Sequence, residues 1–489
     1  MSFGLSDFAA IRPEIALLVA AIAILILEKP LRRAKTEIGS LIALFGIGAA
    51  GVLLVTGSTS GRFFDGVFAV DAFTNFFRYA TLIAGGIGTL TGATFQRSLG
   101  FHRPEHFALL LLAMVGVTLT AGSRDLALTV LTLETGAIAS YALLGTHTTN
   151  EKSRESMMKS FLLGSLATIL LVIGVAFLFG ATGATRYDAV REGLAAAGGS
   201  HPFVVLGLML ILAGIGFRLT VFPFCMFAPD ALQGAPATAS AVVSATSVLA
   251  GAAGLARLGQ SLGVAALGID WSPLLWAIAA LTILLGNLVA IYQDNVRRMV
   301  AYSTVAHAGY VFLGLAIFLS PGVSEPTRSA ALSAVLVYLV VFVFMQAGAF
   351  LLVSSIFFGK RHGEYLPEFA GIGRRCPVLG LAFLLVLLSL AGLPPTAGFL
   401  GRFGLLMVAF EADFYALGVV ALIGTALGFF YYLRVAVLMY FREDPHLPGM
   451  IDSMPLRAAL GIVAIAVLFL GLFPAKMIET AAKSVGALF

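Results

Sequence analysis

The chain has 489 residues, of which 59% are hydrophobic and only 11% are charged, and its formal net charge is +5. Soluble domains carry about 25% charged residues and about 45–50% apolar residues, so this composition excludes an ordinary water-soluble fold. The small positive charge is spread over loops, which argues against nucleic-acid binding.

Long apolar segments follow one another from end to end of the chain. A membrane-spanning helix needs about 20 mostly apolar residues, and an open sheet cannot cross lipid because its edge groups would lack hydrogen bonds. On this length rule we predict an all-α integral membrane protein with about fourteen transmembrane helices in the lipid bilayer. The predicted spans are 13–28, 39–56, 71–95, 106–122, 125–145, 157–180, 203–223, 237–258, 273–292, 299–319, 330–358, 378–409, 414–441 and 456–480.

The short loops between these spans differ in their lysine and arginine content. One side carries the larger set, namely Lys29, Arg32, Arg33, Lys35, Arg97, Arg103, Lys152, Arg154, Arg297, Arg298, Lys360, Arg361, Arg374, Arg375 and Arg442. Because positive loops stay in the cytoplasm, we expect both termini on the periplasmic side of a bacterial inner membrane. The first span follows no basic leader, so we interpret it as a membrane helix rather than a cleaved signal peptide.

Two predicted spans contain helix breakers. The span at 203–223 ends at Pro223, and the span at 378–409 is cut at Pro394 and Pro395. Proline removes a helical hydrogen bond, and broken backbone at membrane depth is tolerated only when it is buried in protein or lines a wet cavity. Breaks at matching places in two halves are typical of inverted-repeat transporters.

We therefore predict two inverted five-helix repeats with two broken helices. The predicted division is 1–105 for helices one to three, 106–258 for the first repeat, 259–445 for the second repeat and 446–489 for the last helix.

Two charged residues in the first predicted repeat are candidates for proton transfer. Glu134 lies in the middle of LALTVLTLETGAIASYALLG and Lys159 lies near the start of the next span. A charge at the bilayer centre costs about 2.5–3.5 kcal/mol on insertion scales, so Glu134 needs a partner or a proton. A desolvated lysine can release a proton near neutral pH. The alternatives are a structural glutamate between helices and a lysine whose ammonium reaches the headgroups.

Two arginines and a histidine complete the candidate set. Arg218 precedes the first break and Arg402 follows the second, whereas His307 lies within a predicted span. Arginine stays protonated, so it can pin a carboxylate or set a field, but it relays protons poorly; a fixed ion pair or a carbonyl-bound arginine is the alternative. Histidine relays protons near pH 7, although a satisfied structural histidine is the alternative.

Several other polar residues are interpreted as structural. Asp230 is expected to cap the helix that resumes after the break, Glu14 to lie at a helix N-terminus, and Arg78 and Asp71 to reach the membrane surface. His102 and His106 have HxxxH spacing but include Pro104 between them, so we interpret them as loop residues. Cys225 and Cys376 have no CxxC partner, and we predict neither a disulfide nor a metal site.

The motifs around the breaks resemble a known family. FRLTVFPFCMFAPDALQGAPATASAVVS resembles the broken-helix segment of the antiporter-like subunits of respiratory complex I, relatives of the multisubunit sodium/proton antiporter proteins. GNLVAIYQDNVRRMVAYSTVAHAGYVFLG, LAGLPPTAGFLGRF and RPEIALLVAAIAILILE are more similar to the subunit N branch of bacterial complex I. The resemblance runs over nearly the whole chain.

The resemblance implies a fourteen-helix membrane-arm subunit of proton-translocating NADH:quinone oxidoreductase, an enzyme complex of the respiratory chain. It implies that Glu134 and Lys159 form a carboxylate–lysine pair. It also implies that other membrane subunits are partners, and that NADH, FMN, Fe–S clusters and quinone bind to partner subunits, with no cofactor in this chain.

The chain departs from the family pattern at several lysine positions. Arginine replaces lysine at Arg218, Arg297 and Arg402, valine stands at Val248, and Cys225 replaces a histidine. Permanent cations in place of titratable ones predict weak or rerouted proton pumping. The alternatives are a subunit of a multisubunit cation/proton antiporter or a membrane hydrogenase, and a pump-inactive structural paralogue.

Overall fold

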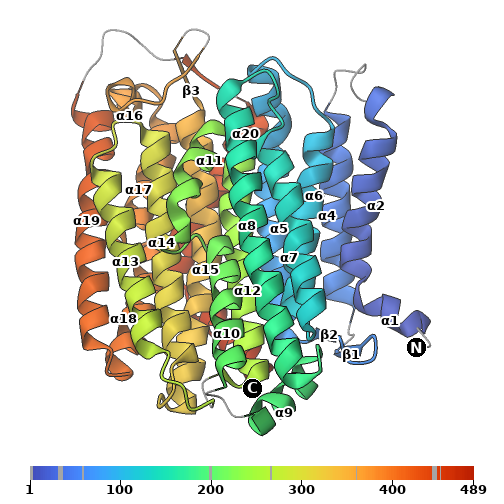
Figure 1. The fold of residues 1–489 in the computed structure, drawn as a ribbon. Coiled ribbons are helices and arrows are strands. Elements are labelled where there is room, and N and C mark those ends of the chain that lie inside the picture. Colours follow the sequence, from blue (N-terminus) through green and yellow to red (C-terminus); the bar gives the residue numbers. More distant parts are fainter. Residues whose placement is uncertain are drawn as a thin grey trace.

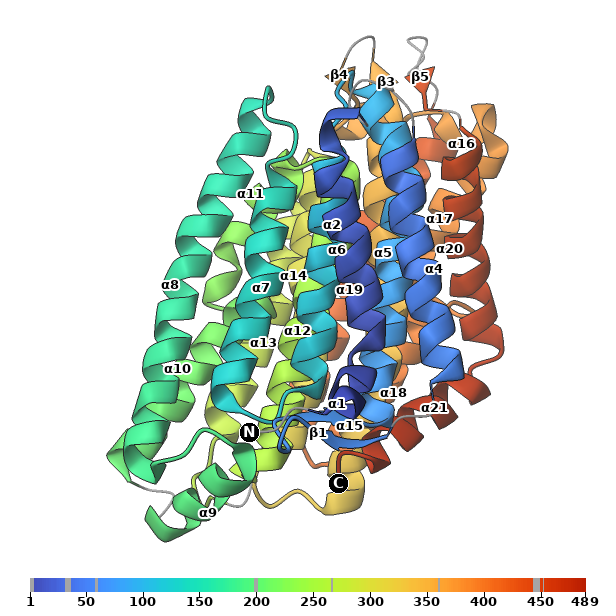
Figure 2. The same ribbon diagram turned by 90° about the vertical axis from the view of Figure 1, so that its right-hand side faces the viewer.

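The computed structural model describes residues 4–30, 37–57, 60–197, 201–264, 267–358, 361–442, 449–451 and 453–489. Its long helices run side by side in a bundle, with both termini at the same end (Figures 1 and 2). Arg32, Arg33, Lys35 and Lys360, which support the predicted orientation, lie outside the described residues.

The predicted spans are found as helices in the described residues. Ten of these helices are long and apolar enough to cross a membrane. The N-terminal part contains α1 (Leu5–Ala10), α2 (Arg12–Ile26), α4 (Ile38–Thr56) and α5 (Ala72–Ser98), with the antiparallel hairpin β1 (Gly61–Phe63) and β2 (Phe68–Val70) before α5.

The next group of helices contains the first break. It comprises α6 (Glu105–Gly122), α7 (Leu126–Leu144), α8 (Glu151–Thr182), the short α9 (Tyr187–Ala197), α10 (Pro202–Arg218), the 3₁₀ turn η1 (Phe224–Phe227), α11 (Ala228–Gly234) and α12 (Ala237–Leu262). The helical hydrogen bonding stops after Arg218, where Thr220 takes a left-handed backbone conformation with φ of 55°. The seventh predicted span, 203–223, is therefore helical only as far as Arg218, and α11 resumes the helix beyond the span.

The following group contains the second break. It comprises α13 (Ser272–Ile291), α14 (Val296–Leu319), α15 (Glu325–Ser354), η3 (Leu366–Phe369), α16 (Ile372–Arg375), α17 (Pro377–Ala391), α18 (Ala397–Glu411) and α19 (Tyr415–Phe441). The small sheet at the upper end has the order β4 (Arg361–His362), β3 (Ile356–Phe358), β5 (Gly449–Met450). α17 is followed by its cap residue Gly392, whose φ of 79° favours glycine.

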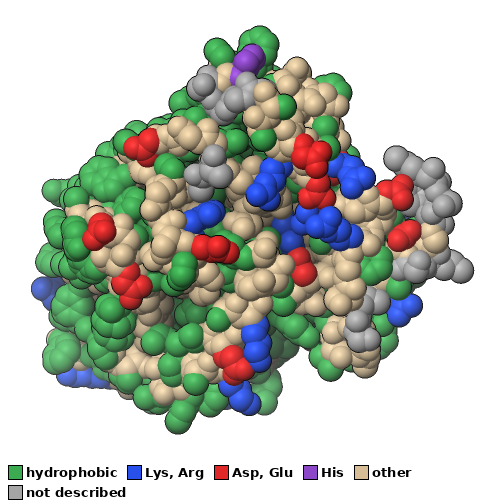
Figure 3. Space-filling model, turned by 90° about the horizontal axis from the view of Figure 1, so that it is seen from below, with side chains coloured by type: hydrophobic (Ala, Val, Ile, Leu, Met, Phe, Trp, Pro, Cys, Tyr) green, Lys and Arg blue, Asp and Glu red, His purple; other side chains and the backbone are tan. Residues whose placement is uncertain are grey.

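The last predicted span, 456–480, is wrong beyond Leu472. α20 (Met454–Leu472) crosses the bundle and ends before Pro474, and α21 (Ala475–Gly486) then lies across the lower end (Figure 2). α21 carries Lys476, Glu479 and Lys483 on an exposed face and buries Met477 and Ala481, so it is an amphipathic surface helix. Seen from this end, Figure 3 shows hydrophobic side chains around much of the rim and charged side chains on the face itself.

The centre of the bundle is formed by α12, α14 and α15. In each of them 94% of the most apolar stretch is buried, against 28% for α8. A helix that is apolar all round belongs in a core, and small residues bring α12 close to its neighbours. A Cβ added at Gly251 would lie 3.0 Å from the backbone nitrogen of Leu219, at the first break.

Two buried ion pairs hold the N-terminal helices, and the expectation that Arg78 and Asp71 reach the membrane surface is wrong. Arg78 donates to both oxygens of Glu14 at 2.8 and 2.9 Å, and Arg257 donates to both oxygens of Asp71 at 2.6 and 2.8 Å. Both arginines are almost fully buried. Each is paired because a lone charge in this environment would be costly, so these residues fasten α5 to α2 and α12.

A loop at the upper end joins the two helix groups. The Glu364 carboxylate accepts hydrogen bonds from Asn295 at 2.8 Å and Lys152 at 3.3 Å, and its backbone carbonyl accepts from the Val296 N–H at 2.7 Å. Burial by itself would raise the pKa of Glu364, but Arg297, Asn295 and Lys152 together hold that pKa below its ordinary value.

The lowered pKa of Glu364 predicts that the stability of the protein depends on pH. Because the folded-state pKa of Glu364 is depressed, its contribution is complete above the ordinary value of 4.5 and is lost as the pH falls further. The thermal unfolding temperature of the native protein should therefore fall more steeply below that pH than the temperature of Glu364→Gln. Glu151→Gln removes an exposed carboxylate at the same end and should behave as the native protein; equal slopes for all three would refute the prediction.

Candidate functional site: a buried carboxylate–arginine pair at a broken helix

The first break brings a carboxylate and a cation together inside the bundle. Arg218, the last residue of α10, donates from Nη2 to Glu134 Oε2 at 2.9 Å and from Nη1 to the Tyr141 hydroxyl at 2.6 Å. Thr168 donates to the same Glu134 oxygen at 2.6 Å. The Arg218 side chain is 8% exposed and the Glu134 side chain 25%. The pair joins α7, α8 and α10 at the point where α10 ends.

The local sequence explains why the pair forms here. A cation in the last turn of a helix lies near the negative end of the helix dipole, and the Arg218 carbonyl accepts a hydrogen bond from Ser247 at 3.0 Å. Gly164 on α8 leaves room for Tyr141, since a Cβ added there would lie 1.8 Å from the Tyr141 hydroxyl oxygen. The break thus directs a fixed positive charge at Glu134.

A small cavity adjoins the pair. It has a volume of about 30 Å³ and is lined by Ser140, Tyr141, Ser160, Arg218 and Ser247 among other residues. A buried water needs about 10–15 Å³ and two or more polar partners, so this space accommodates water. The Ser160 hydroxyl is fully buried and has no protein partner among the described residues.

Lys159 does not pair with Glu134, in contrast to the pairing that the family resemblance implies. Its ammonium lies 2.6 Å from Glu155 and 2.7 Å from Asp230, and its side chain is 41% exposed. Glu134 lies level with Thr168 on α8, and nine helical residues between Lys159 and Thr168 correspond to about 13 Å of rise. Lys159 is therefore neither desolvated nor within reach of the buried pair.

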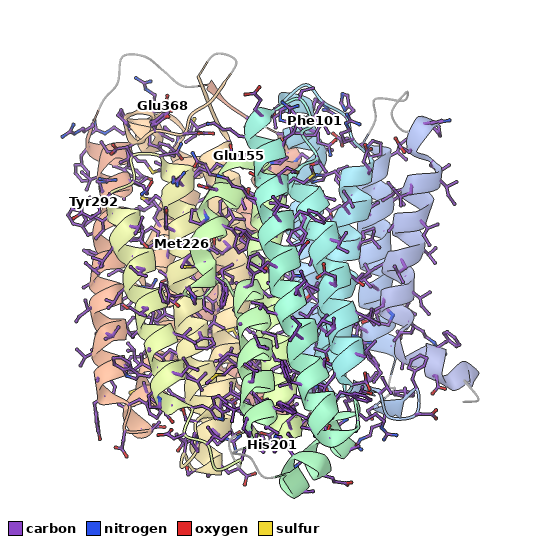
Figure 4. The ribbon with its side chains drawn as sticks, in the orientation of Figure 1. Phe101, Glu155, His201, Met226, Tyr292 and Glu368 are labelled. Atoms are coloured by element: carbon purple, nitrogen blue, oxygen red, sulfur yellow. The ribbon has the colours of Figure 1, made fainter. Side chains whose placement is uncertain are left out.

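A charged cluster surrounds Lys159 at the upper end of α8. Asp230, in the first turn of α11, also accepts from Arg298 at 3.0 Å, so it joins α8 and α14 rather than only capping a helix. Figure 4 shows Glu155 towards the upper end of α8 and Met226 farther down, in the η1 turn.

Because the ion pairs of Lys159 are partly exposed, they should contribute little stability. Lys159→Gln is expected to change the free energy of unfolding by no more than about 1 kcal/mol. Denaturant unfolding of the native protein and the variant in the same detergent measures this. A loss comparable to that of a buried pair would show that Lys159 is more enclosed in the assembled protein.

The second break also contains a buried arginine, Arg402. Arg402 on α18 donates to the Ala391 carbonyl at 2.9 Å and to the Leu390 carbonyl, at the end of α17. Its guanidinium lies 5.0 Å from the centre of the Tyr310 ring. Among the described residues no carboxylate forms an ion pair with it. Arg402 therefore donates hydrogen bonds to carbonyls at the end of α17 that have no partner within the helix. This is the carbonyl-bound arginine that the sequence left as an alternative.

His307 lies near Arg402 within a group of tyrosines. Its Nδ1 is 2.5 Å from the Tyr338 hydroxyl and its Nε2 is 3.2 Å from the Tyr432 hydroxyl, and the ring is fully buried. A neutral imidazole donates from one nitrogen and accepts at the other. This arrangement can pass a proton between α15 and α19 without creating a net charge.

The sequence patterns gave the wrong environment for one buried polar residue, His106, and did not identify another, Arg257. His106 is in the first turn of α6, not in a loop, and its two nitrogens each lie 3.0 Å from a hydroxyl, those of Thr146 and Thr238. Arg257 was not singled out, although it stands alone in the apolar run GAAGLARLGQSL. Arg297 is also buried and donates to the Ala235 carbonyl, whereas Val248 packs in the core with no exposed surface.

Comparison with known proteins identifies the family. The model of the family described as NADH:quinone oxidoreductase/Mrp antiporter, transmembrane, matches residues 123–428. The chain belongs to this family. The matched region runs from the start of α7 through both breaks to α19, so it contains Glu134, Arg218 and His307. The predicted multi-pass, antiporter-like membrane fold is thereby confirmed.

Within the NADH:quinone oxidoreductase/Mrp antiporter family, several individual proteins are similar to this chain over nearly its whole length. The chain is 35% identical to NADH-quinone oxidoreductase subunit N of Trichlorobacter lovleyi, over 97% of this chain and 96% of that protein. It is 32% identical to the subunit N of Parvibaculum lavamentivorans, over 99% and 98%. A chain of respiratory complex I from Thermus thermophilus superposes with a TM-score of 0.79 at 29% identity, covering 96% of this chain and 99% of that chain.

Proposed function

We propose that the chain is a membrane-arm subunit of a proton-translocating NADH:quinone oxidoreductase. The observation that carries the proposal is the Glu134–Arg218 pair, with its arginine buried and its glutamate partly buried, at a helix break within a family fold whose close relatives are named subunit N. Electron transfer belongs to other chains of the complex. NADH, FMN, Fe–S clusters and quinone are assigned to those partner subunits.

We propose that Arg218 acts as a fixed positive charge rather than as a proton carrier. A guanidinium remains protonated at physiological pH, and here it is held by both Glu134 and Tyr141. It therefore places a permanent positive charge beside the Glu134 carboxylate. Pumping through this subunit is then weak, or it follows a route that avoids Arg218.

The cavity and the charged cluster both lie near the Glu134–Arg218 pair. Glu155, Lys159 and Asp230 lie at the upper end of α8, and Ser160, next to Lys159, lines the cavity beside Tyr141 and Arg218. Water in the cavity would contact Ser160, Tyr141 and Arg218, which line it. In the second half, we assign proton relay to His307 between Tyr338 and Tyr432, with Arg402 setting the local field.

The division into repeats at 106–258 and 259–445, with flanking parts 1–105 and 446–489, is proposed on the matching positions of the two breaks. We also propose a bacterial inner-membrane location with the upper end of the bundle in the cytoplasm and both termini in the periplasm. The upper end carries Arg97, Arg103, Lys152 and Arg298 among the described residues.

Purification of the tagged chain from its native membrane tests the assignment. Subunits that oxidise NADH should co-purify with it in constant proportion, together with other membrane subunits. Recovery with only the subunits of a cation/proton antiporter or a hydrogenase would refute the proposal.

A further inference from the structure

An apolar slot of about 370 Å³ lies between α10 and α13, next to the first break. α10 packs mainly against α8, and α13 packs mainly against α14, so the slot separates two helix pairs. Its inner wall includes the fully buried Phe312. Ala213, Gly216 and Ala277 also line it, and their small side chains leave the space open.

The slot is elongated along the helices. Its edges run from Met209 to Gly216 on α10 and from Leu274 to Leu281 on α13, and seven helical residues rise about 10 Å. The rim residues Met209, Leu274 and Leu281 are exposed, so the slot opens sideways from the bundle. The break closes its upper end, where the Phe222 N–H donates to Thr282 Oγ1 at 2.9 Å.

The shape and the apolar lining of the slot indicate its occupant. The slot follows the helices for about 10 Å and opens sideways towards the lipid, and a single hydrocarbon chain is long and narrow. The lining has no charged side chain, and lipid is the solvent at this depth. The atoms that line an empty slot would lack van der Waals contacts on that side. We propose that the slot binds one acyl chain of a membrane phospholipid, lying parallel to the membrane normal.

The seated chain would contact the break that positions Arg218. Val221, Phe222 and Phe224 line the slot, and Arg218 lies just before them, directed towards Glu134. Filling the slot therefore supports the backbone on which the buried pair depends. The lipid contact does not depend on which complex the chain joins, so its failure and that of the proposed function are separable.

Photolabelling tests the proposal on the intact complex isolated from its membrane. The complex is reconstituted in vesicles of phosphatidylethanolamine and phosphatidylglycerol with a small fraction of phospholipid bearing a diazirine in the middle of one acyl chain. After irradiation, labelled residues are identified by mass spectrometry. Labelling should concentrate at the slot residues of α10 and α13, above that at exposed apolar residues elsewhere on α13.

Two variants that fill the slot and one control variant outside it show whether the labelling depends on the slot. Ala277→Phe and Ala213→Phe place a ring in the slot and should abolish the concentrated labelling, whereas Leu288→Phe adds the same ring to an exposed position of α13 outside the slot and should retain it. Native labelling no stronger at the slot than elsewhere on α13 would overturn the proposal, as would undiminished labelling in an assembled filled variant. A cross-link from the slot to another subunit would also overturn it.

Discussion

Glu134→Ala is expected to destabilise the protein by about 3–5 kcal/mol, because it leaves the Arg218 guanidinium buried without its carboxylate. Exposed charged pairs contribute far less, so the effect should exceed that of any substitution in the Lys159 cluster. Denaturant unfolding of the purified protein in detergent, together with the yield of assembled complex, measures it.

A double-mutant cycle separates the pair from other effects of the substitution. Glu134→Gln and Arg218→Gln should each be destabilising, but together they remove both charges, so the double variant should recover much of the lost stability. Simple addition of the two losses would show that Glu134 and Arg218 are not coupled.

Arg218→Lys is expected to increase the number of protons translocated per NADH oxidised by the complex. The substitution keeps a cation beside Glu134, but a buried lysine can release its proton near physiological pH, whereas arginine cannot. The measurement is proton uptake and release by proteoliposomes, with NADH oxidation recorded in the same sample.

Arg97→Lys is the matched control for this experiment. Arg97 is 63% exposed and pairs with Glu37 at the upper end of the bundle, so the same exchange of side chains should leave the proton count unchanged. An equal or lower count in Arg218→Lys than in the native complex would mean that Arg218 does not limit proton transfer.

Much of the fold could be predicted from the sequence because lipid requires long apolar helices and tolerates breaks only in protected places. The spans and both breaks follow from apolar length and from Pro223, Pro394 and Pro395. The α20–α21 boundary was missed because 456–480 remains apolar on average, although Pro474 and the spacing of Lys476, Glu479 and Lys483 mark the surface helix.

The partners of the buried charges could not be predicted in the same way. Hydropathy identifies Glu134 and Arg218 as unusual, but pairing depends on which helices touch and at what height. The family resemblance implied a pair of Lys159 with Glu134, but about 13 Å of helix rise separates Lys159 from the level of Glu134. Asp71 and Arg257 are 186 positions apart, and nothing local in the sequence connects them.

The number of protons translocated per NADH tests most directly whether a permanent cation at Arg218 weakens pumping. It should be measured side by side in proteoliposomes for this complex and for one whose corresponding subunit carries lysines at the positions of Arg218, Val248 and Arg402. We expect a lower ratio for the complex that contains this chain. Equal ratios would contradict the account, because a protonated guanidinium paired with Glu134 would then not limit proton transfer.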